Sequence, residues 1–384
     1  MPFLLAATVL VFCALYAPQP LLPLFAETYG VSETRAALLI TATLLPLSVA
    51  PIAYGLWLER LSARRVLAIS VVLLGVTQIA FAVADSFTVL VASRVAQGLL
   101  IPAAVTALMT FIAGRTPADR LATTMATYIA ATVVGGFLGR FLAGLAASYL
   151  TWEAAFWVLG LAMVALGPLL LRIQGDQPPN TTRIRWRDCR EVLNRGGVQA
   201  ACIIGFSIFF IFSAVLTYLP FRVGELRPDA GEDTVALLYA GYLMGIVVAL
   251  GAGRITVWTG SQRRTISLGL LAFLAALVGF LVPEVPVLFA AMILICGGMF
   301  LVHGTTPGLI NALAPDRRGV INGLYVAAYY AGGTLGAWLP GMLFTQAGWG
   351  VMVIAIAAML IVALMATRHL PEPGPRAEPG EQDQ

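Results

Sequence analysis

The chain contains no lysine, and only 11% of its 384 residues are charged. A soluble protein has about a quarter of its residues charged, so the composition excludes an ordinary soluble globular fold. The 23 arginines leave a net charge of +4 that is divided between alternate loops, which does not indicate a nucleic-acid surface. No nucleotide-binding loop, HExxH or GxSxG motif is present, and no separate soluble domain fits, so an enzyme or a receptor has little support.

Cysteine and histidine are also scarce, with four and two residues, and neither has the spacing of a metal site. We therefore expect neither a metal nor another cofactor. The cysteines lie in apolar stretches or in the central loop, without a pairing pattern, and are predicted to be free thiols: Cys13, Cys189, Cys202 and Cys296.

Long apolar stretches make up most of the sequence, and 59% of the residues are hydrophobic. A helix needs about 20 apolar residues to cross roughly 30 Å of hydrocarbon. A strand barrel is excluded because its segments are short and alternating. The sequence predicts twelve transmembrane helices at residues 2–26, 36–58, 65–85, 87–113, 121–149, 153–173, 198–221, 233–257, 265–283, 286–311, 319–345 and 348–367.

Arginine is concentrated in every second loop and in the C-terminal tail, which together hold 18 of the 23 arginines. Because loops on the cytoplasmic side carry the basic excess, both termini are expected in the cytoplasm and the protein in a bacterial-type inner membrane. The first stretch lacks a basic start, and Pro18, Pro20 and Pro23 break it, so we interpret it as a span rather than a signal peptide. Residues 174–197 are expected to form a cytoplasmic linker, and 368–384 a disordered tail.

An internal repeat relates the two halves at an offset of 197 residues. The segment from Tyr128 to Gly144 aligns with the segment from Tyr325 to Gly341, and nine of 17 positions are identical. The sequence thus predicts an all-α membrane protein of two pseudo-symmetric six-helix bundles, residues 1–173 and 198–367. Parallel halves of this kind place a substrate site at mid-membrane on their interface.

The loop after the second span carries Gly55-Leu-Trp-Leu-Glu59-Arg60-Leu-Ser-Ala-Arg64-Arg65-Val-Leu67. It resembles the loop 2–3 signature of the major facilitator superfamily, Gly-x-x-x-Asp-Arg-x-Gly-Arg-Lys-x-x-Leu, although Ser62 and Ala63 depart from it. The resemblance implies the superfamily fold and a cytoplasmic gating latch. The latch would comprise Gly55, Glu59, Arg60, Arg64, Asp119 and Arg120. Alternatively these are surface charges that contribute little.

Three further motifs indicate subgroups within the superfamily. Arg94-Val-Ala-Gln97-Gly98 is similar to the Arg-x-x-Gln-Gly signature of proton-linked members. Tyr16-Ala-Pro-Gln19-Pro20-Leu-Leu-Pro23 and Phe300-Leu-Val-His303 resemble drug/proton antiporters of the arabinose-efflux type. Arg140-Phe141 differs, because many antiporters have Gly-Pro at that place.

Ionisable side chains inside the predicted spans are the strongest candidates for functional residues. An arginine at mid-bilayer costs at least about 2.5–3.5 kcal/mol, so Arg94 and Arg140 must each face a polar cavity, a ligand or backbone carbonyls. We expect them to share a cavity that selects against cations, while packing between helices remains the alternative. His303, with an ordinary pKa of about 6.5, either carries a coupled proton or is a neutral, hydrogen-bonded helix residue.

No Asp or Glu lies in the middle of a predicted span. The acidic residues that adjoin the spans, such as Glu27, lie at the outer ends. This weakens a simple exchange of protons for cationic drugs and favours anionic or polar neutral substrates. The candidate cavity residues are Gln19, Arg94, Gln97, Tyr128, Arg140, His303, Asn322 and Tyr325, and the candidate helix-packing glycines are Gly135, Gly139, Gly332 and Gly336.

Two functions follow from the sequence. The first is a proton-coupled antiporter that exports a small molecule. The second is an importer or facilitator of an organic anion or a sugar-like solute. The expected partners are a small-molecule substrate, protons and the lipid bilayer, without nucleic acid, and the chain is expected to act as a monomer.

Overall fold

The structure is a computed structural model that describes residues 1–57, 62–117, 120–173, 186–313 and 317–371. Every regular element in these ranges is helical. The elements are α1 (Pro2–Tyr16), η1 (Gln19–Leu21), α2 (Leu22–Tyr29), α3 (Glu33–Ala36), α4 (Leu38–Trp57), α5 (Ala63–Ala82), α6 (Phe87–Arg115), α7 (Leu121–Tyr149), α8 (Trp152–Leu171), α9 (Trp186–Leu193), α10 (Val198–Leu226), α11 (Glu232–Leu238), η3 (Tyr239–Leu243), α12 (Met244–Thr259), α13 (Gln262–Phe280), α14 (Val285–Leu313) and α15 (Arg318–Thr367).

Eleven helical segments of the described ranges are long and apolar enough to cross a membrane. The last of them, Val320–Thr367, is bent at Gly348, whose φ of 81° and ψ of 176° are not helical. Glycine adopts a positive φ without a steric penalty, which permits this sharp bend. Each side of the bend is long enough to cross a membrane. The predicted fold class is therefore confirmed, with the last two spans joined directly at a kink.

Two spans are interrupted by 3₁₀ segments. In the first, η1 separates α1 from α2, because Pro18, Pro20 and Pro23 lack the N–H groups that a continuous helix needs. In the eighth, η3 separates α11 from α12. Both interruptions pack against α7, so irregular backbone from early and late in the chain meets at one helix.

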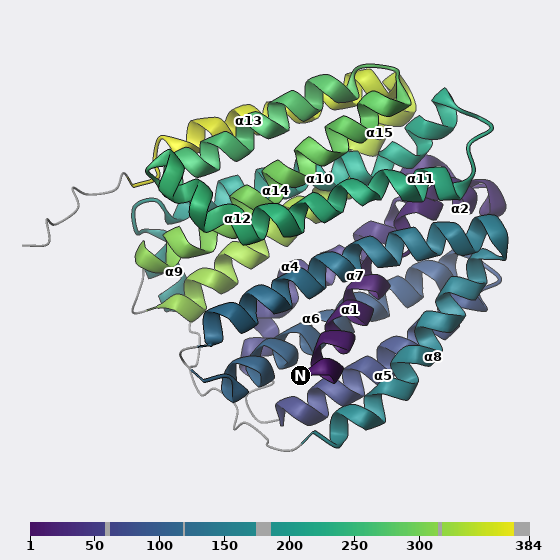
Figure 1. Cartoon of the computed structure of the whole chain (residues 1–384). Coiled ribbons are helices and arrows are strands. Elements are labelled where there is room, and N and C mark those ends of the chain that lie inside the picture. The colour runs from purple at the N-terminus through teal and green to yellow at the C-terminus, as the bar shows by residue number, and fades with distance from the viewer. Residues whose placement is uncertain (58–61, 118–119, 174–185, 314–316, 372–384) are drawn as a thin grey trace, which may run out of the picture.

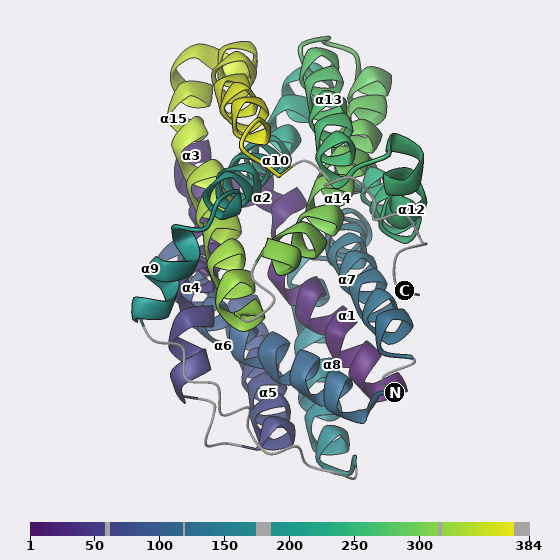
Figure 2. The same cartoon turned by 90° about the vertical axis from the view of Figure 1, so that its left-hand side faces the viewer.

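The helices form two groups that lie side by side. In Figures 1 and 2, α1 and α5–α8 lie in one group, and α10 and α12–α15 lie in the other. The groups meet where α4 packs along α15 and where α7 packs against α11, η3 and α12. A substrate path between the groups would run along these helices.

Close helix contacts repeat at the sequence offset of 197. A Cβ on Gly135 would lie 2.5 Å from the Val9 carbonyl oxygen, and one on Gly139 would lie 2.6 Å from that of Cys13. A Cβ on either equivalent glycine, Gly332 or Gly336, would lie even closer to the carbonyl oxygen of Phe206 or Phe210, which stand 197 residues after Val9 and Cys13. These four glycines thus allow α7 and α15 to touch α1 and α10 in the same way.

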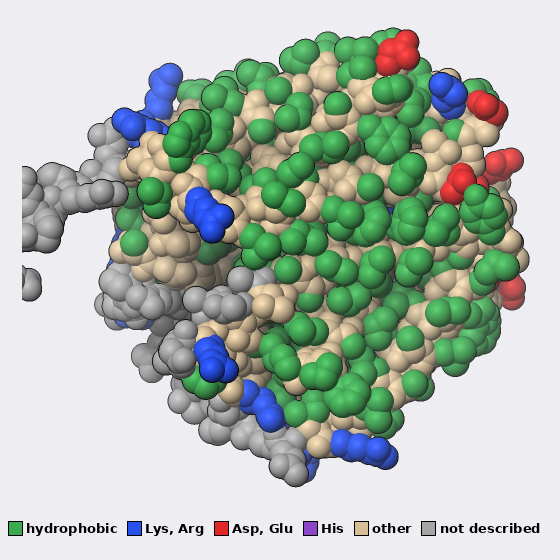
Figure 3. All heavy atoms as spheres, in the orientation of Figure 1, with side chains coloured by type: hydrophobic (Ala, Val, Ile, Leu, Met, Phe, Trp, Pro, Cys, Tyr) green, Lys and Arg blue, Asp and Glu red, His purple; other side chains and the backbone are tan. Residues whose placement is uncertain are grey.

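Charge divides the molecule into two ends. Figure 3 shows a face covered by hydrophobic side chains, with acidic side chains gathered at one end and most basic side chains at the other. We define the acidic end by the turns near residues 30, 85, 150, 229 and 283, and the arginine end by those near 64, 117, 172, 263 and 317. The hydrophobic face between them is suited to contact with lipid.

Candidate functional site

The break in the first span frees a backbone acceptor in the protein interior. In a continuous helix the Ala14 carbonyl would accept from the N–H of residue 18, but that residue is Pro18. Two buried side chains donate instead: Gln78 through Nε2 at 3.4 Å and Arg94 through an Nη atom at 2.8 Å. The broken helix is thereby completed by neighbouring helices α5 and α6.

Arg94 is fully buried and tied to protein oxygens on all sides. Besides Ala14 it donates to the Leu39 carbonyl at 2.7 Å, to the Leu15 carbonyl at 2.5 Å and to Gln97 Oε1 at 2.5 Å. Four of its five N–H groups are used, and the acceptors lie on α1, α4 and α6. The expectation that Arg94 shares a polar cavity with Arg140 does not fit this geometry, because backbone carbonyls already solvate its guanidinium.

The neighbouring residues of the Arg94 motif pack the same three helices. Gln97 is completely buried and accepts from Arg94. A Cβ on Gly98 would lie 2.6 Å from the Thr43 carbonyl oxygen, so α6 touches α4 at this point. Thr43 in turn donates to the Arg94 carbonyl at 3.2 Å. The Arg-x-x-Gln-Gly pattern therefore joins α1, α4 and α6 in this chain.

Arg140 has a different environment, at the meeting of the two helix groups. Its guanidinium carbon lies 4.1 Å from the ring centre of Tyr16, 5.2 Å from that of Tyr239 and 4.8 Å from that of Tyr242. Nε donates to Gln19 Oε1 at 2.7 Å, and an Nη atom donates to the Gly136 carbonyl at 2.7 Å. Three tyrosine faces and two oxygens thus enclose a cation, and each ring stabilises it through its π-electrons.

We call Arg140, Tyr16, Gln19, Tyr239 and Tyr242 the arginine cage. Tyr16 and Gln19 come from the first span, Arg140 from α7, and the other two tyrosines from η3. Gln19 also donates to the Thr217 hydroxyl of α10 at 3.3 Å. The cage therefore connects the two helix groups, and these contacts depend on how the groups sit against each other.

A series of aromatic contacts leads from the cage into the second group. Tyr242 lies 6.0 Å from Phe212, and Phe212 lies 6.5 Å from Phe209, between ring centres. Phe209 stacks on Tyr329 at 4.1 Å with an interplanar angle of 14°. The rings pack on one another and so connect the cage with α15.

His303 stands at the far end of this series. Its ring centre is 4.4 Å from that of Tyr329, and Nδ1 lies 3.2 Å from the Tyr325 hydroxyl. Two of the candidate cavity residues, His303 and Tyr325, are therefore brought together by α14 and α15. The side chain of His303 is partly exposed, whereas Tyr325 is buried.

The remaining cavity candidates occupy separate places. Tyr128 is buried within α7. Asn322 donates to Asn311 Oδ1 at 3.0 Å, near the arginine end of α15. The structure thus gathers Gln19 and Arg140 in the cage and His303 with Tyr325, while Arg94 and Gln97 pack α6 elsewhere.

Three cage tyrosines escaped the analysis of the sequence as candidate site residues: Tyr16, Tyr239 and Tyr242. A signal for the last two exists, since residues three apart lie on one face of a helical segment. Tyr16 stands immediately before the proline break, where a backbone interruption inside a membrane indicates a cavity or a binding site.

Half of the proposed cytoplasmic latch falls outside the described residues, which do not include Glu59, Arg60 or Asp119. Gly55 lies within α4. Arg64 donates to the Ile173 carbonyl at 3.2 Å and so links the start of α5 to the end of α8. Arg120 is exposed at the start of α7.

At the acidic end, polar contacts join the two groups. Thr34 and Thr345 lie 3.1 Å apart between hydroxyl oxygens, and Thr345 also donates to Glu33 Oε2 at 3.3 Å. Ser148 accepts from the backbone N–H of Asp233 at 2.9 Å, and Tyr149 donates to its carboxylate at 3.2 Å. The acidic end is therefore closed between the groups.

Comparison with known proteins gives a consistent result. The family described as Major Facilitator Superfamily matches residues 4–315 and 260–384. The chain is 23% identical to the inner membrane transport protein YnfM of Escherichia coli (strain K12), over 96% of this chain and 89% of that protein. It is 27% identical to the probable transporter SCO4007 of Streptomyces coelicolor, over 97% and 87%.

Solved structures of low sequence identity share the fold. A variant of the nucleoside transporter NupG has a TM-score of 0.80 at 13% identity and covers 96% of this chain and 99% of that one. A bacterial homolog of the human lysosomal transporter Spinster, inward-facing and unoccupied, has a TM-score of 0.78 at 12% identity, over 97% and 98%. The human organic anion transporter MFSD10 has a TM-score of 0.70 at 16% identity, over 95% and 98%.

Proposed function

The chain belongs to the major facilitator superfamily, and on this premise we propose that it exports a small molecule across a bacterial inner membrane in exchange for protons. The finer assignment is to the drug/proton antiporter subgroup of arabinose-efflux type. We propose that the protein is a transporter without enzymatic activity and that it functions as a monomer.

The observation that carries the proposal is the arginine cage. It places a cation, an amide and three tyrosines where both helix groups meet. Two of the five Arg140 N–H groups donate to Gln19 and to the Gly136 carbonyl, and the guanidinium also hydrogen-bonds to Tyr242. The remaining N–H groups are available to water or a ligand, as a substrate site at such an interface requires.

The transport cycle would proceed by alternating access. Residues 1–173 would rock against residues 198–367, with 174–197 as the connecting linker. If the arginine end faces the cytoplasm, the contacts of Thr34, Thr345, Ser148 and Asp233 close the outer side. The structure would then correspond to a state that opens inward, and the latch around Glu59 would close the inner side in the opposite state.

We assign the coupled proton to His303. It is partly exposed, hydrogen-bonded to a tyrosine, and joined to the cage through a series of aromatic contacts. No Asp or Glu side chain is buried within the described residues, which leaves histidine as the titratable group best placed between the groups. In an exchange of substrate for proton, protonated His303 and bound substrate would disfavour each other, so that binding of one accompanies release of the other.

A second function, import or facilitated passage of an organic anion or a sugar-like solute, is favoured by one specific observation. Arg140 is held by neutral groups, so its positive charge is available to attract a carboxylate. The fold is shared with a nucleoside transporter and an organic anion transporter. Both functions use the same site and differ in direction and coupling.

Proteoliposomes that contain a pH-sensitive dye test the proposal. A panel of aromatic carboxylates, nucleosides, sugars and lipophilic cations is added with and without an imposed pH gradient. If the protein exports by proton exchange, protons should move in the direction opposite to at least one solute. The accumulation of that solute should disappear when the pH gradient is collapsed. Solute movement that is indifferent to the gradient would favour the facilitator, and no movement of any solute would contradict both.

A further inference from the structure

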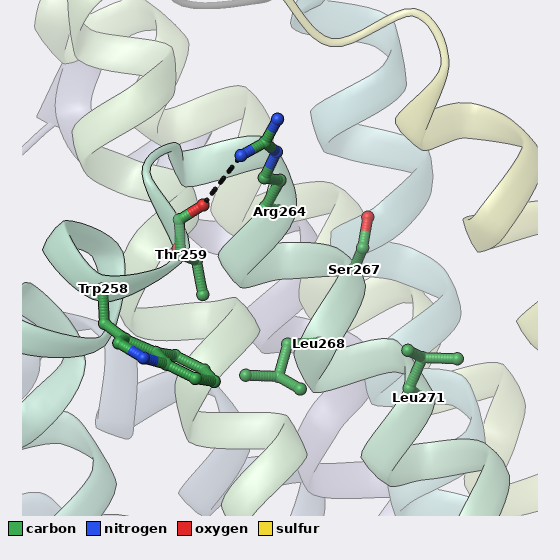
Figure 4. Close-up of a pocket in the computed structure, with 6 residues that line it drawn as sticks. All are labelled: Trp258, Thr259, Arg264, Ser267, Leu268 and Leu271. Carbon is green, nitrogen blue, oxygen red and sulfur yellow. Dashed lines mark hydrogen bonds between the residues drawn. The ribbon is translucent and has the colours of Figure 1, made fainter.

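A groove of about 380 Å³ lies on the outside of the second helix group, between α12 and α13. It is lined by Trp258, Thr259, Arg264, Ser267, Leu268 and Leu271. Figure 4 shows the indole of Trp258 reaching from α12 toward Leu268, while Arg264 and Ser267 stand above the two leucines along α13. The groove is independent of the arginine cage and has no part in the transport proposed above.

The lining changes from polar to apolar along α13. Arg264 lies in its first turn, Ser267 in the next, and Leu271 seven residues after Arg264, or about 10 Å deeper at 1.5 Å per residue. Trp258 is 81% exposed, and Leu271 is 53% exposed. A phospholipid has the same sequence of chemistry over this distance: a phosphate, then esters, then an acyl chain.

The mouth of the groove is positively charged. Arg264 is exposed, and its Nη atom donates to the Thr259 carbonyl at 3.3 Å, which orients the guanidinium at the rim. Its other N–H groups form a fork that matches a phosphate. No Asp or Glu occurs in the sequence between Asp233 and Glu284, so α12 and α13 carry arginines without acids of their own.

The position in the fold matches the boundary of a bilayer. The turn between α12 and α13 lies at the arginine end, and tryptophan side chains concentrate where hydrocarbon meets the headgroups. Basic pockets between transmembrane helices near the cytoplasmic surface are suited to anionic headgroups. We propose that this groove is a binding site for an anionic phospholipid, with its phosphate on Arg264 and one acyl chain between Trp258 and Leu271.

Fluorescence quenching by brominated phospholipids tests this on the purified full-length chain. Trp258→Phe serves as the reference, so the difference from wild type isolates the signal of that one tryptophan. We expect brominated phosphatidylglycerol to quench Trp258 at a concentration several-fold lower than brominated phosphatidylcholine. Arg264→Gln and Ser267→Glu should each remove this difference, because one deletes the positive charge and the other adds a negative charge at the mouth.

Arg263→Gln is the matched control, since it removes the same charge one residue away and outside the groove lining. It should retain the preference for the anionic lipid. Equal quenching by both lipids in the wild type would overturn the proposal, because Trp258 would then meet only the general lipid surface. A preference that survives in Arg264→Gln, or that disappears equally in Arg263→Gln, would also overturn it.

Discussion

At the scale of single residues, two buried arginines have opposite surroundings. Arg94 meets backbone carbonyls, two of them at the proline break of the first span and one on α4, whereas Arg140 meets tyrosine rings and an amide. The sequence identified both as exceptional because a charge inside a span needs partners. It could not tell them apart, since the partners come from helices that are distant in the chain.

Arg94→Ala is expected to reduce stability rather than selectivity. The substitution removes four hydrogen bonds and leaves the Ala14 carbonyl without its stronger donor, at a cost of about 1–3 kcal/mol. The measurement is the midpoint of thermal aggregation in detergent, together with the yield of folded protein. An Arg94→Ala protein that is as stable as wild type would show that the carbonyl contacts do not hold these helices.

Arg140→Ala is expected to leave a folded protein with an altered substrate site. Loss of a charge-assisted contact corresponds to about tenfold or more in the apparent affinity for an anionic substrate. Arg140→Lys should recover part of it, because lysine keeps the cation over the tyrosine rings but lacks the fork. Binding is measured by the thermal shift that each solute produces. Lipophilic cations that prove to be the best ligands would contradict this assignment.

His303→Gln is expected to uncouple transport from the pH gradient. Glutamine can still accept from the Tyr325 hydroxyl, so packing is retained while the titratable group is lost. Accumulation driven by the gradient should disappear, and exchange of labelled for unlabelled solute should continue. If the variant retains full gradient-driven accumulation, another group such as Glu27 carries the proton.

At the scale of elements, the structural repeat extends to more helices than the aligned sequence segments cover. The alignment covered only the fifth and eleventh spans, yet the contacts made by their glycines are repeated at the same offset on α1 and α10. The span lengths and the proline break were also predictable, because hydrophobic length and missing N–H groups are local properties. The η3 segment and the bend at Gly348 were not, since they depend on contacts and on one backbone dihedral angle.

Gly336→Ala is expected to disturb the contact of α15 with α10. The new methyl group would overlap the Phe210 carbonyl, which cannot move without shifting its helix. Overpacking of this kind costs about 1–3 kcal/mol. Gly304→Ala in α14 is the matched control, because nothing lies within 4 Å of its added Cβ. A lower thermal midpoint for the first variant alone is the expected outcome; equal midpoints would contradict the packing argument.

At the scale of the whole molecule, the described polar and cation–π contacts between the two helix groups lie in two places. One is the set of polar contacts at the acidic end, and the other is the arginine cage with Gln19 and Thr217. The sequence indicated that the two groups would face each other. It did not indicate which end is closed, because that depends on the state of the molecule and not on the composition of any segment.

The central claim is that the two groups alternate between closure at the acidic end and closure at the arginine end. Distances between spin labels at two pairs of exposed or half-buried positions test it most directly: Ser32 with Gln346 at the acidic end, and Thr110 with Ala312 at the arginine end. We predict two distance populations at each end that change in opposite directions when pH or substrate is varied. Glu59→Gln should shift both pairs toward the state that is open at the arginine end. A single unchanging distance at both ends, or a simultaneous lengthening of both pairs, would contradict the account.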